Sequence, residues 1–74
     1  MAMNDWEQII NATDFYVWKK DDLLVYVHYI EHDYMTTENH WFVKIERSET
    51  TLKHESFSTE QEARNHAKKY MRTH

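Results

Sequence analysis

The segment LLVYVHYI, residues 23–30, places the strongest constraint on the fold of this chain. Its Val, Tyr and Ile residues favour a β-strand, in which successive side chains point to opposite faces. The odd-numbered residues are Leu, Val, Val and Tyr, and the even-numbered residues are Leu, Tyr, His and Ile. A strand in a small antiparallel sheet usually has one face exposed to water. Here both faces are apolar, so the second face requires a cover from the same chain or from another molecule.

The chain is short enough to form one domain over residues 1–74. A core of this size rarely supplies more than about 3–5 kcal/mol, so burial against a partner would add stability. There is no Cys, no secretory-type N-terminus and no long apolar run, which indicates a cytoplasmic protein with no membrane association. The absence of Gly and Pro disfavours two-residue hairpin turns and predicts longer polar loops.

The first expected element is a short helix over residues 5–12, with Asp5 as its cap and Gln8 three residues later. A β-hairpin is predicted over residues 15–30 around KKDD, and its second strand extends to about Tyr34. After a turn at 36–40, WFVKIER (41–47) alternates as a half-buried strand. The segment LKHESF (52–57) reads as a polar edge strand after a turn at 48–51.

The C-terminal segment STEQEARNHAKKYMRTH predicts a helix capped by Ser58 or Thr59. Its expected packing stripe consists of Ala63, His66, Ala67, Tyr70 and Met71. The predicted fold is therefore α+β: a three- to four-stranded antiparallel meander, a short N-terminal helix, and a C-terminal helix packed on the sheet.

The sequence HYIEH, from His28 to His32, matches the H-x-x-E-H pattern of some zinc peptidases. That chemistry needs both histidines on one face of a helix, whereas on a strand they lie roughly 13 Å apart. The six histidines are otherwise scattered, without the short paired spacings of a zinc site. We therefore expect no catalytic residues, no metal and no cofactor.

Charge is distributed unevenly along the chain, whose net charge is −4. Residues 1–62 contain all thirteen Asp and Glu but only five Lys and Arg, a balance of −8, and residues 63–74 have a balance of +4. Nucleic-acid binding depends largely on neutralising phosphates with Lys and Arg. An acidic body therefore disfavours direct nucleic-acid binding and favours a protein partner with a basic surface.

The partner-binding face is predicted from the alternation of the strands. If Val25, Val27 and Val43 face the helices, the opposite face consists of Tyr16, Trp18, Leu24, Tyr26, His28, Ile30 and Phe42. Two covers for this face remain open: the N-terminal helix with Trp6 and Ile10, or another protein or a second copy of the chain. Stacking of single-stranded bases on its rings is a third possibility. Acidic residues at its rim include Asp21, Asp22 and Glu38.

These observations predict a non-catalytic protein-binding module, either monomeric or a homodimer. The small size and the acidic balance are typical of accessory inhibitors from phages or mobile elements, including anti-CRISPR-like proteins. Such a protein would act on a host defence or regulatory protein. Its carboxylates would occupy a nucleic-acid-binding groove of the target where phosphates otherwise lie.

The order of strands followed by STEQEARNHAKKYM resembles the end of a double-stranded-RNA-binding domain, with Ser58, Ala63 and Ala67 in similar positions. Glu60 and Gln61 stand where that family has phosphate-binding lysines. The segment WFVKIERSETTLKHESFSTEQEA also resembles the strand-strand-helix unit of phage-integrase arm-binding domains, which have basic strands. Both resemblances imply the topology, and they make a nucleic-acid-binding domain the alternative function.

Overall fold

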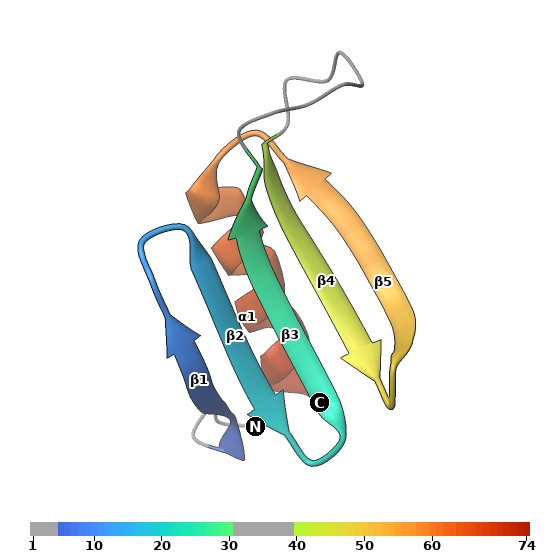
Figure 1. Cartoon of the computed structure of the whole chain (residues 1–74). Helices are drawn as coiled ribbons and strands as arrows, with labels where there is room; N and C mark the ends of the chain where they lie inside the picture. Colours follow the sequence, from blue (N-terminus) through green and yellow to red (C-terminus); the bar gives the residue numbers. More distant parts are fainter. Residues whose placement is uncertain (1–4, 31–39) are drawn as a thin grey trace.

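The computed structural model describes residues 5–30 and 40–74, which form one antiparallel sheet and one helix (Figure 1). The strands follow one another in the order β1-β2-β3-β4-β5, so each strand pairs with its neighbour in sequence. The α+β class and the C-terminal helix are confirmed, but the sheet has five strands instead of three or four. Their bounds are β1 (Glu7–Asn11), β2 (Phe15–Lys20), β3 (Leu23–Tyr29), β4 (Trp41–Arg47), β5 (Thr50–Phe57) and α1 (Glu60–Thr73).

The predicted N-terminal helix is wrong, because residues 7–11 form the edge strand β1. Asp5 and Gln8 fit a helix cap, but a helix of two turns is only marginally stable in water. As a strand, the same segment pairs its backbone with β2, and Ala12 N donates to Phe15 O at 2.9 Å in the turn. This pairing satisfies backbone groups that β2 would otherwise leave exposed.

Two hairpins are closed by two-residue loops, although the chain has no Gly. Asp21 in the β2–β3 loop has φ 55°, and Ser48 and Glu49 in the β4–β5 loop have φ 48° and 70°. Positive φ at both residues of the β4–β5 loop, and at the first residue of the β2–β3 loop, is the geometry of tight turns that match the twist of paired strands. The expectation of longer loops is therefore wrong here: non-glycine residues adopt the left-handed conformation at an energetic cost.

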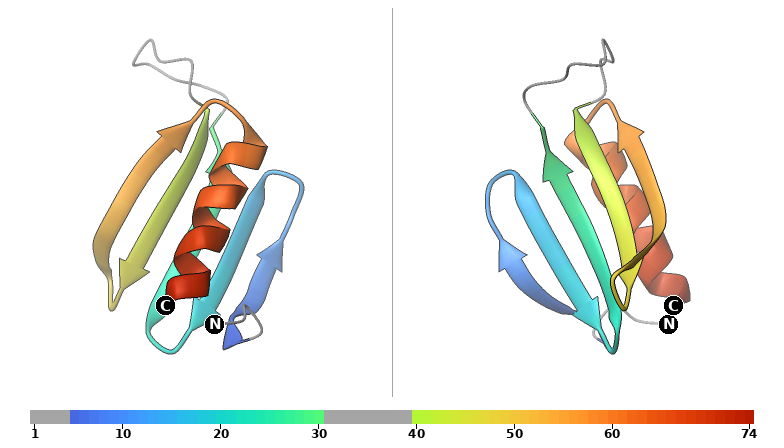
Figure 2. Two further views of the ribbon diagram at one scale, coloured as in Figure 1. Left: turned by 180° about the vertical axis from the view of Figure 1, so that it is seen from behind. Right: turned by 45° about the vertical axis from the view of Figure 1, so that its right-hand side comes forward.

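Helix α1 packs across one face of the sheet (Figure 2). Thr59 is its N-cap, and its hydroxyl accepts a hydrogen bond from Glu62 N at 3.2 Å. Ala63, Ala67 and Met71 are fully buried against β3 and β4, and small alanines allow the helix to approach the sheet closely. The predicted stripe is confirmed, with His66 and Tyr70 half-buried at its margins.

Trp6 completes this core from the other end of the chain. Its ring is 7% exposed, and its Nε1 donates a hydrogen bond to Met71 O at 3.0 Å. The indole thus covers the last turn of α1 and satisfies a carbonyl that has no partner within the helix. Trp6 belongs to the helix-facing side of the sheet, so it does not cover the opposite face.

We predict that Glu49→Gly will stabilise the protein, because Gly adopts positive φ without the steric penalty of a β-carbon. The expected increase in the free energy of unfolding is about 0.5–1 kcal/mol, after allowing for the greater freedom of Gly in the unfolded chain. Urea denaturation measures the change. Thr50→Gly, one residue later in β5, is the matched control and should lower stability by about 0.5–1 kcal/mol. Equal destabilisation by both substitutions would contradict a left-handed residue at position 49.

Candidate functional site

The face of the sheet opposite α1, here called the open face, is the candidate site. Within residues 5–30 and 40–74, no helix or second sheet lies over it (Figure 2). The strand registers place on this face Glu7, Ile10, Phe15, Val17, Lys19, Leu24, Tyr26, His28, Phe42, Lys44, Glu46, Thr51, His54 and Ser56. The site is therefore a surface built on five paired strands.

A row of rings crosses the open face from β2 to β5. Phe15 meets His28 edge-on, with ring centroids 6.4 Å apart, and His28 stacks on Phe42 at 5.5 Å. Phe42 in turn stacks on His54 at 5.6 Å. These contacts follow from the register, because Phe15, His28 and Phe42 are direct cross-strand neighbours. Each ring shields part of the next, and Phe15, His28 and Phe42 remain half-buried rather than covered.

Val17 is buried on the open face, although α1 packs on the opposite face of the sheet. It lies between Ile10 and Tyr26 in its cross-strand row, and it is 2% exposed. It is not a member of the core cluster beneath α1. The open face thus has a small apolar centre of its own, and this centre is shielded from water by neighbouring side chains alone.

A polar group adjoins the row of rings. The hydroxyl of Tyr26 donates to Glu46 Oε1 at 3.2 Å, and Lys44 Nζ lies 3.1 Å from Glu46 Oε2. The same ammonium lies over the Tyr26 ring, 5.7 Å from its centroid. Burial, and then the nearby Glu46 carboxylate, raise the pKa of Tyr26. These three side chains neutralise one another and leave no net charge in this part of the face.

His28 is held in its neutral form by its surroundings. Burial lowers its pKa from the ordinary value of 6.5, and the positive charges that His54 and Lys44 can hold lower it further. A neutral imidazole costs less to desolvate than an imidazolium. At pH 7 the half-buried part of the row, formed by Phe15, His28 and Phe42, therefore behaves as an apolar surface.

Tyr16 and Trp18, both predicted on the partner-binding face, lie instead on the helix-facing side. They are 7% and 6% exposed, and their rings stack on each other beneath α1 at 6.2 Å. In a hairpin with two loop residues, an even-numbered residue of β2 faces an odd-numbered residue of β3: Trp18 pairs with Val25. The sequence prediction placed Tyr16 and Trp18 on the same face as the even-numbered residues of β3. Even-numbered residues of the two strands share a face only when the loop between them has an odd number of residues.

The other predicted residues are only partly brought together. Leu24, Tyr26, His28 and Phe42 share the open face, whereas Ile30 follows the end of β3 and is 40% exposed. Asp21 and Asp22 form the loop at the end of the β2–β3 hairpin away from Phe15 and His28. Asp22 Oδ1 lies 3.6 Å from Arg47 Nε. Glu38 lies outside the described residues.

Sequence reasoning missed Phe15, Val17, Lys19 and His54 as members of this face. The alternation of residues 41–47 did place Lys44 and Glu46 on the same side as Phe42, although they were not named as partner-binding residues. For Phe15 and Val17 the signal was available, since counting across an even-numbered loop places them opposite His28 and Tyr26. His54 needed the register of β5, which shifts at a bulge between Ile45 and Glu46. A bulge of this kind has no clear signature in the sequence.

The H-x-x-E-H pattern does not adopt the geometry that its chemistry requires at His28, because β3 remains extended through Tyr29. Its second histidine, His32, lies outside the described residues. Among the residues that the structure describes, no group of three or more His, Asp or Glu side chains is placed to hold a metal ion. No helix in that part of the chain is long and apolar enough to cross a membrane.

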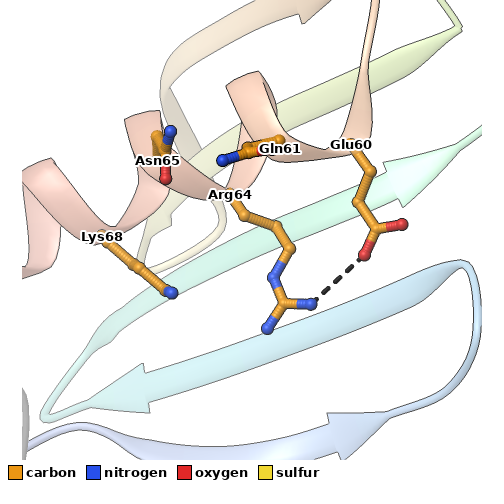
Figure 3. Close-up of a pocket in the computed structure, with 5 residues that line it drawn as sticks. All are labelled: Glu60, Gln61, Arg64, Asn65 and Lys68. Carbon is orange, nitrogen blue, oxygen red and sulfur yellow. Dashed lines mark hydrogen bonds and ion pairs between the residues drawn. The ribbon is translucent and has the colours of Figure 1, made fainter.

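An open pocket lies along α1 and is lined by Glu60, Gln61, Arg64, Asn65 and Lys68 (Figure 3). Two of its side chains pair with each other: Arg64 Nη1 donates to Glu60 Oε2 at 3.2 Å. The same oxygen accepts a hydrogen bond from the Tyr16 hydroxyl at 3.0 Å, and the Arg64 guanidinium lies 4.7 Å from the centre of the Tyr16 ring. These contacts attach the helix to β2 and account for the conformation of the pocket wall without a ligand.

A second pocket lies between β5 and the end of α1, with Lys53, His66 and Lys69 among its lining residues. His66 Nε2 lies 3.5 Å from Glu55 Oε2, and the Tyr70 ring stacks on His74 with 4.0 Å between centroids. Charged side chains that line both pockets are thus paired within the chain. The open face is therefore the stronger candidate.

No protein-family model, no curated protein and no solved structure matches this chain. The functional assignment therefore rests on the geometry of the described residues.

We predict that acidification destabilises the protein partly through His28. Its folded-state pKa lies below that of the unfolded chain, so the unfolded state binds more protons between the two values. Stability is accordingly retained above about pH 6.5 and lost as pH falls toward the folded pKa. Urea denaturation at pH 7.5 and pH 5.5 should show a smaller pH-dependent loss for His28→Gln than for the wild type.

The matched control is His74→Gln at the exposed C-terminus, which should retain the pH dependence of the wild type. NMR titration of the His28 ring protons provides a direct measurement. A titration midpoint for His28 at or above 6.5 would contradict its burial among Phe15, Phe42 and His54.

Proposed function

We propose that this chain is a non-catalytic protein-binding module whose open face docks onto another protein. The observation that supports the proposal is the uncovered row of Phe15, His28 and Phe42 beside the apolar centre at Val17. Contiguous apolar surface on a soluble domain usually marks an interaction site, and aromatic side chains are favoured anchors at such sites. Their position on paired strands keeps them in place before binding, which lowers the entropic cost of association.

The charges of the described residues favour a protein over a nucleic acid as the partner. On the open face, Lys44 is paired with Glu46 at 3.1 Å, and His28 is neutral at pH 7. On α1, Arg64 is paired with Glu60, whose position in double-stranded-RNA-binding domains is basic. A phosphate backbone would thus meet carboxylates at both surfaces, and binding that depends on counterion release would be weak.

A finer form of the proposal names the class of partner: a host defence or regulatory protein with a basic, nucleic-acid-binding surface, inhibited by an accessory protein of a phage or mobile element. Its support is the balance of −8 in residues 1–62 together with the exposed loop residues Asp21 and Asp22. Long-range attraction between an acidic body and a basic groove would accelerate association and weaken as salt is added.

The proposal predicts that removing two rings from the open face abolishes capture of a partner. The variant Phe15→Ser/Phe42→Ser and the wild type are immobilised and exposed to lysate of the native host, and the captured proteins are identified by mass spectrometry. For the partner so identified, loss of a central anchor should weaken binding by about 2 kcal/mol, measured by calorimetry. Circular dichroism establishes that the variant is folded.

The matched control is Gln61→Ser/Asn65→Ser on the exposed side of α1, which should retain the partner. Labelled RNA and DNA are titrated in parallel at two salt concentrations. Capture that survives in the open-face variant contradicts the proposal. Salt-dependent nucleic-acid binding by the wild type would support the alternative function instead.

A further inference from the structure

The open face has an approximate two-fold arrangement about its central strand, β3. In one cross-strand row, Leu24 on β3 is flanked by Lys19 on β2 and by Glu46 on β4. In another row, His28 on β3 is flanked by Phe15 on β2 and by Phe42 on β4. β3 is the middle strand of the five (Figure 1). One strand away on either side of it, the first row carries opposite charges and the second row carries aromatic rings.

This arrangement has a specific consequence for symmetry. A two-fold axis parallel to β3 and just above the open face places β2 of one copy over β4 of the other, with the cross-strand rows at the same level. An interface of this kind is self-complementary only if the two sides of the axis carry complementary groups. The row Lys19–Leu24–Glu46 meets this condition for charge, and the row Phe15–His28–Phe42 meets it for aromatic surface.

We infer that the open face binds a second copy of this chain, with the two sheets stacked face to face about a two-fold axis along β3. This inference rests on the proposed function of the open face as a protein-docking surface, and it names the occupant. Lys19 of each copy then lies over Glu46 of the other, so two ion pairs form across the interface. Phe15 of each copy meets Phe42 of the other, and His28 meets His28 near the axis.

The intermediate row is compatible with this stacking. It contains Val17, Tyr26 and Lys44, so Lys44 of one copy lies over the side chains that cover Val17 of the other. The Lys44 ammonium already lies 3.1 Å from Glu46 and over the Tyr26 ring, so its methylene stem is available for the apolar contact. Stacked sheets pack about 10 Å apart, a separation that interdigitating side chains of this size fill.

The ion pair between Lys19 and Glu46 is a contact between copies and not within one chain. The two residues are separated by β3, which places their backbones about 10 Å apart at the usual strand spacing. Within the chain, Glu46 contacts Lys44 and Tyr26. The overall charge of −4 opposes association of two copies, but the Lys and Glu side chains of the open face, Glu7, Lys19, Lys44 and Glu46, balance one another.

Charge reversal with rescue by mixing tests the geometry. Sedimentation of the full chain over a range of concentrations at pH 7.5 should show a monomer–dimer equilibrium. Lys19→Glu alone brings two carboxylates together at each ion pair, and Glu46→Lys alone brings two ammonium groups together, so each variant should dimerise at least tenfold more weakly. An equimolar mixture of the two variants restores opposite charges at both positions and should recover the wild-type dissociation constant.

Lys69→Glu on the exposed side of α1 changes the net charge by the same amount as Lys19→Glu and is the matched control, which should weaken dimerisation far less than Lys19→Glu does. Recovery in the mixture distinguishes loss of an ion pair between copies from unfolding, because a misfolded variant would not regain dimerisation when the other variant is added. A wild-type chain that remains monomeric at all concentrations overturns the inference, and so do single variants that dimerise as strongly as the wild type. If the chain is monomeric but its capture of another protein still depends on Phe15 and Phe42, only the inference that a second copy binds is overturned. The proposed function of the open face then still stands.

Discussion

One helix can cover only one face of a five-stranded sheet, and this limit determines the rest of the molecule. The alanines of α1 allow it to settle against β3 and β4, where Val25, Val27, Val43 and Ile45 are almost completely buried. Their neighbours in sequence necessarily point the other way. These neighbours include Leu24, Tyr26, His28 and Phe42. The strands that supply the buried core therefore also present largely apolar side chains on the opposite face. The rings therefore shield one another only in part, and Phe15, His28 and Phe42 remain half-buried.

The elements of the sheet could be predicted from sequence far better than their register. The alternation in residues 41–47 gives the bounds of β4, and the capping and alanine pattern gives α1, because both signals are local. The face on which Tyr16 and Trp18 lie depends on the number of residues in a loop, and an error of one residue moves every side chain of a strand to the opposite side. The sequence therefore placed Leu24, Tyr26, His28 and Phe42 together on one face, as the structure does, whereas the face assigned to Tyr16 and Trp18 of β2 was inverted.

The N-terminal strand and the tight loops escaped prediction for a different reason. Asp5 and Gln8 are favourable for a helix locally, but the backbone of β2 offers more hydrogen bonds to a strand than a two-turn helix makes for itself. Likewise, the absence of Gly made tight loops locally unfavourable, yet the strain at Ser48 and Glu49 is offset by the long β4–β5 pairing on either side. In both cases the free energy gained by strand pairing exceeds the local conformational preference. Pairing joins separate segments of the chain, so the sequence of a few consecutive residues does not reveal it.

The hydrogen bond between the Trp6 indole and Met71 has a mechanical consequence. The two residues are 65 positions apart in sequence, and their contact holds the segment that leads into β1 and the last turn of α1 at the same end of the sheet (Figure 1). A force applied to the two termini would load this contact first and then peel β1 from β2 one backbone hydrogen bond at a time. The five strands would unzip from an edge instead of shearing together, so the fold should yield at low force when stretched, however stable it is in denaturant.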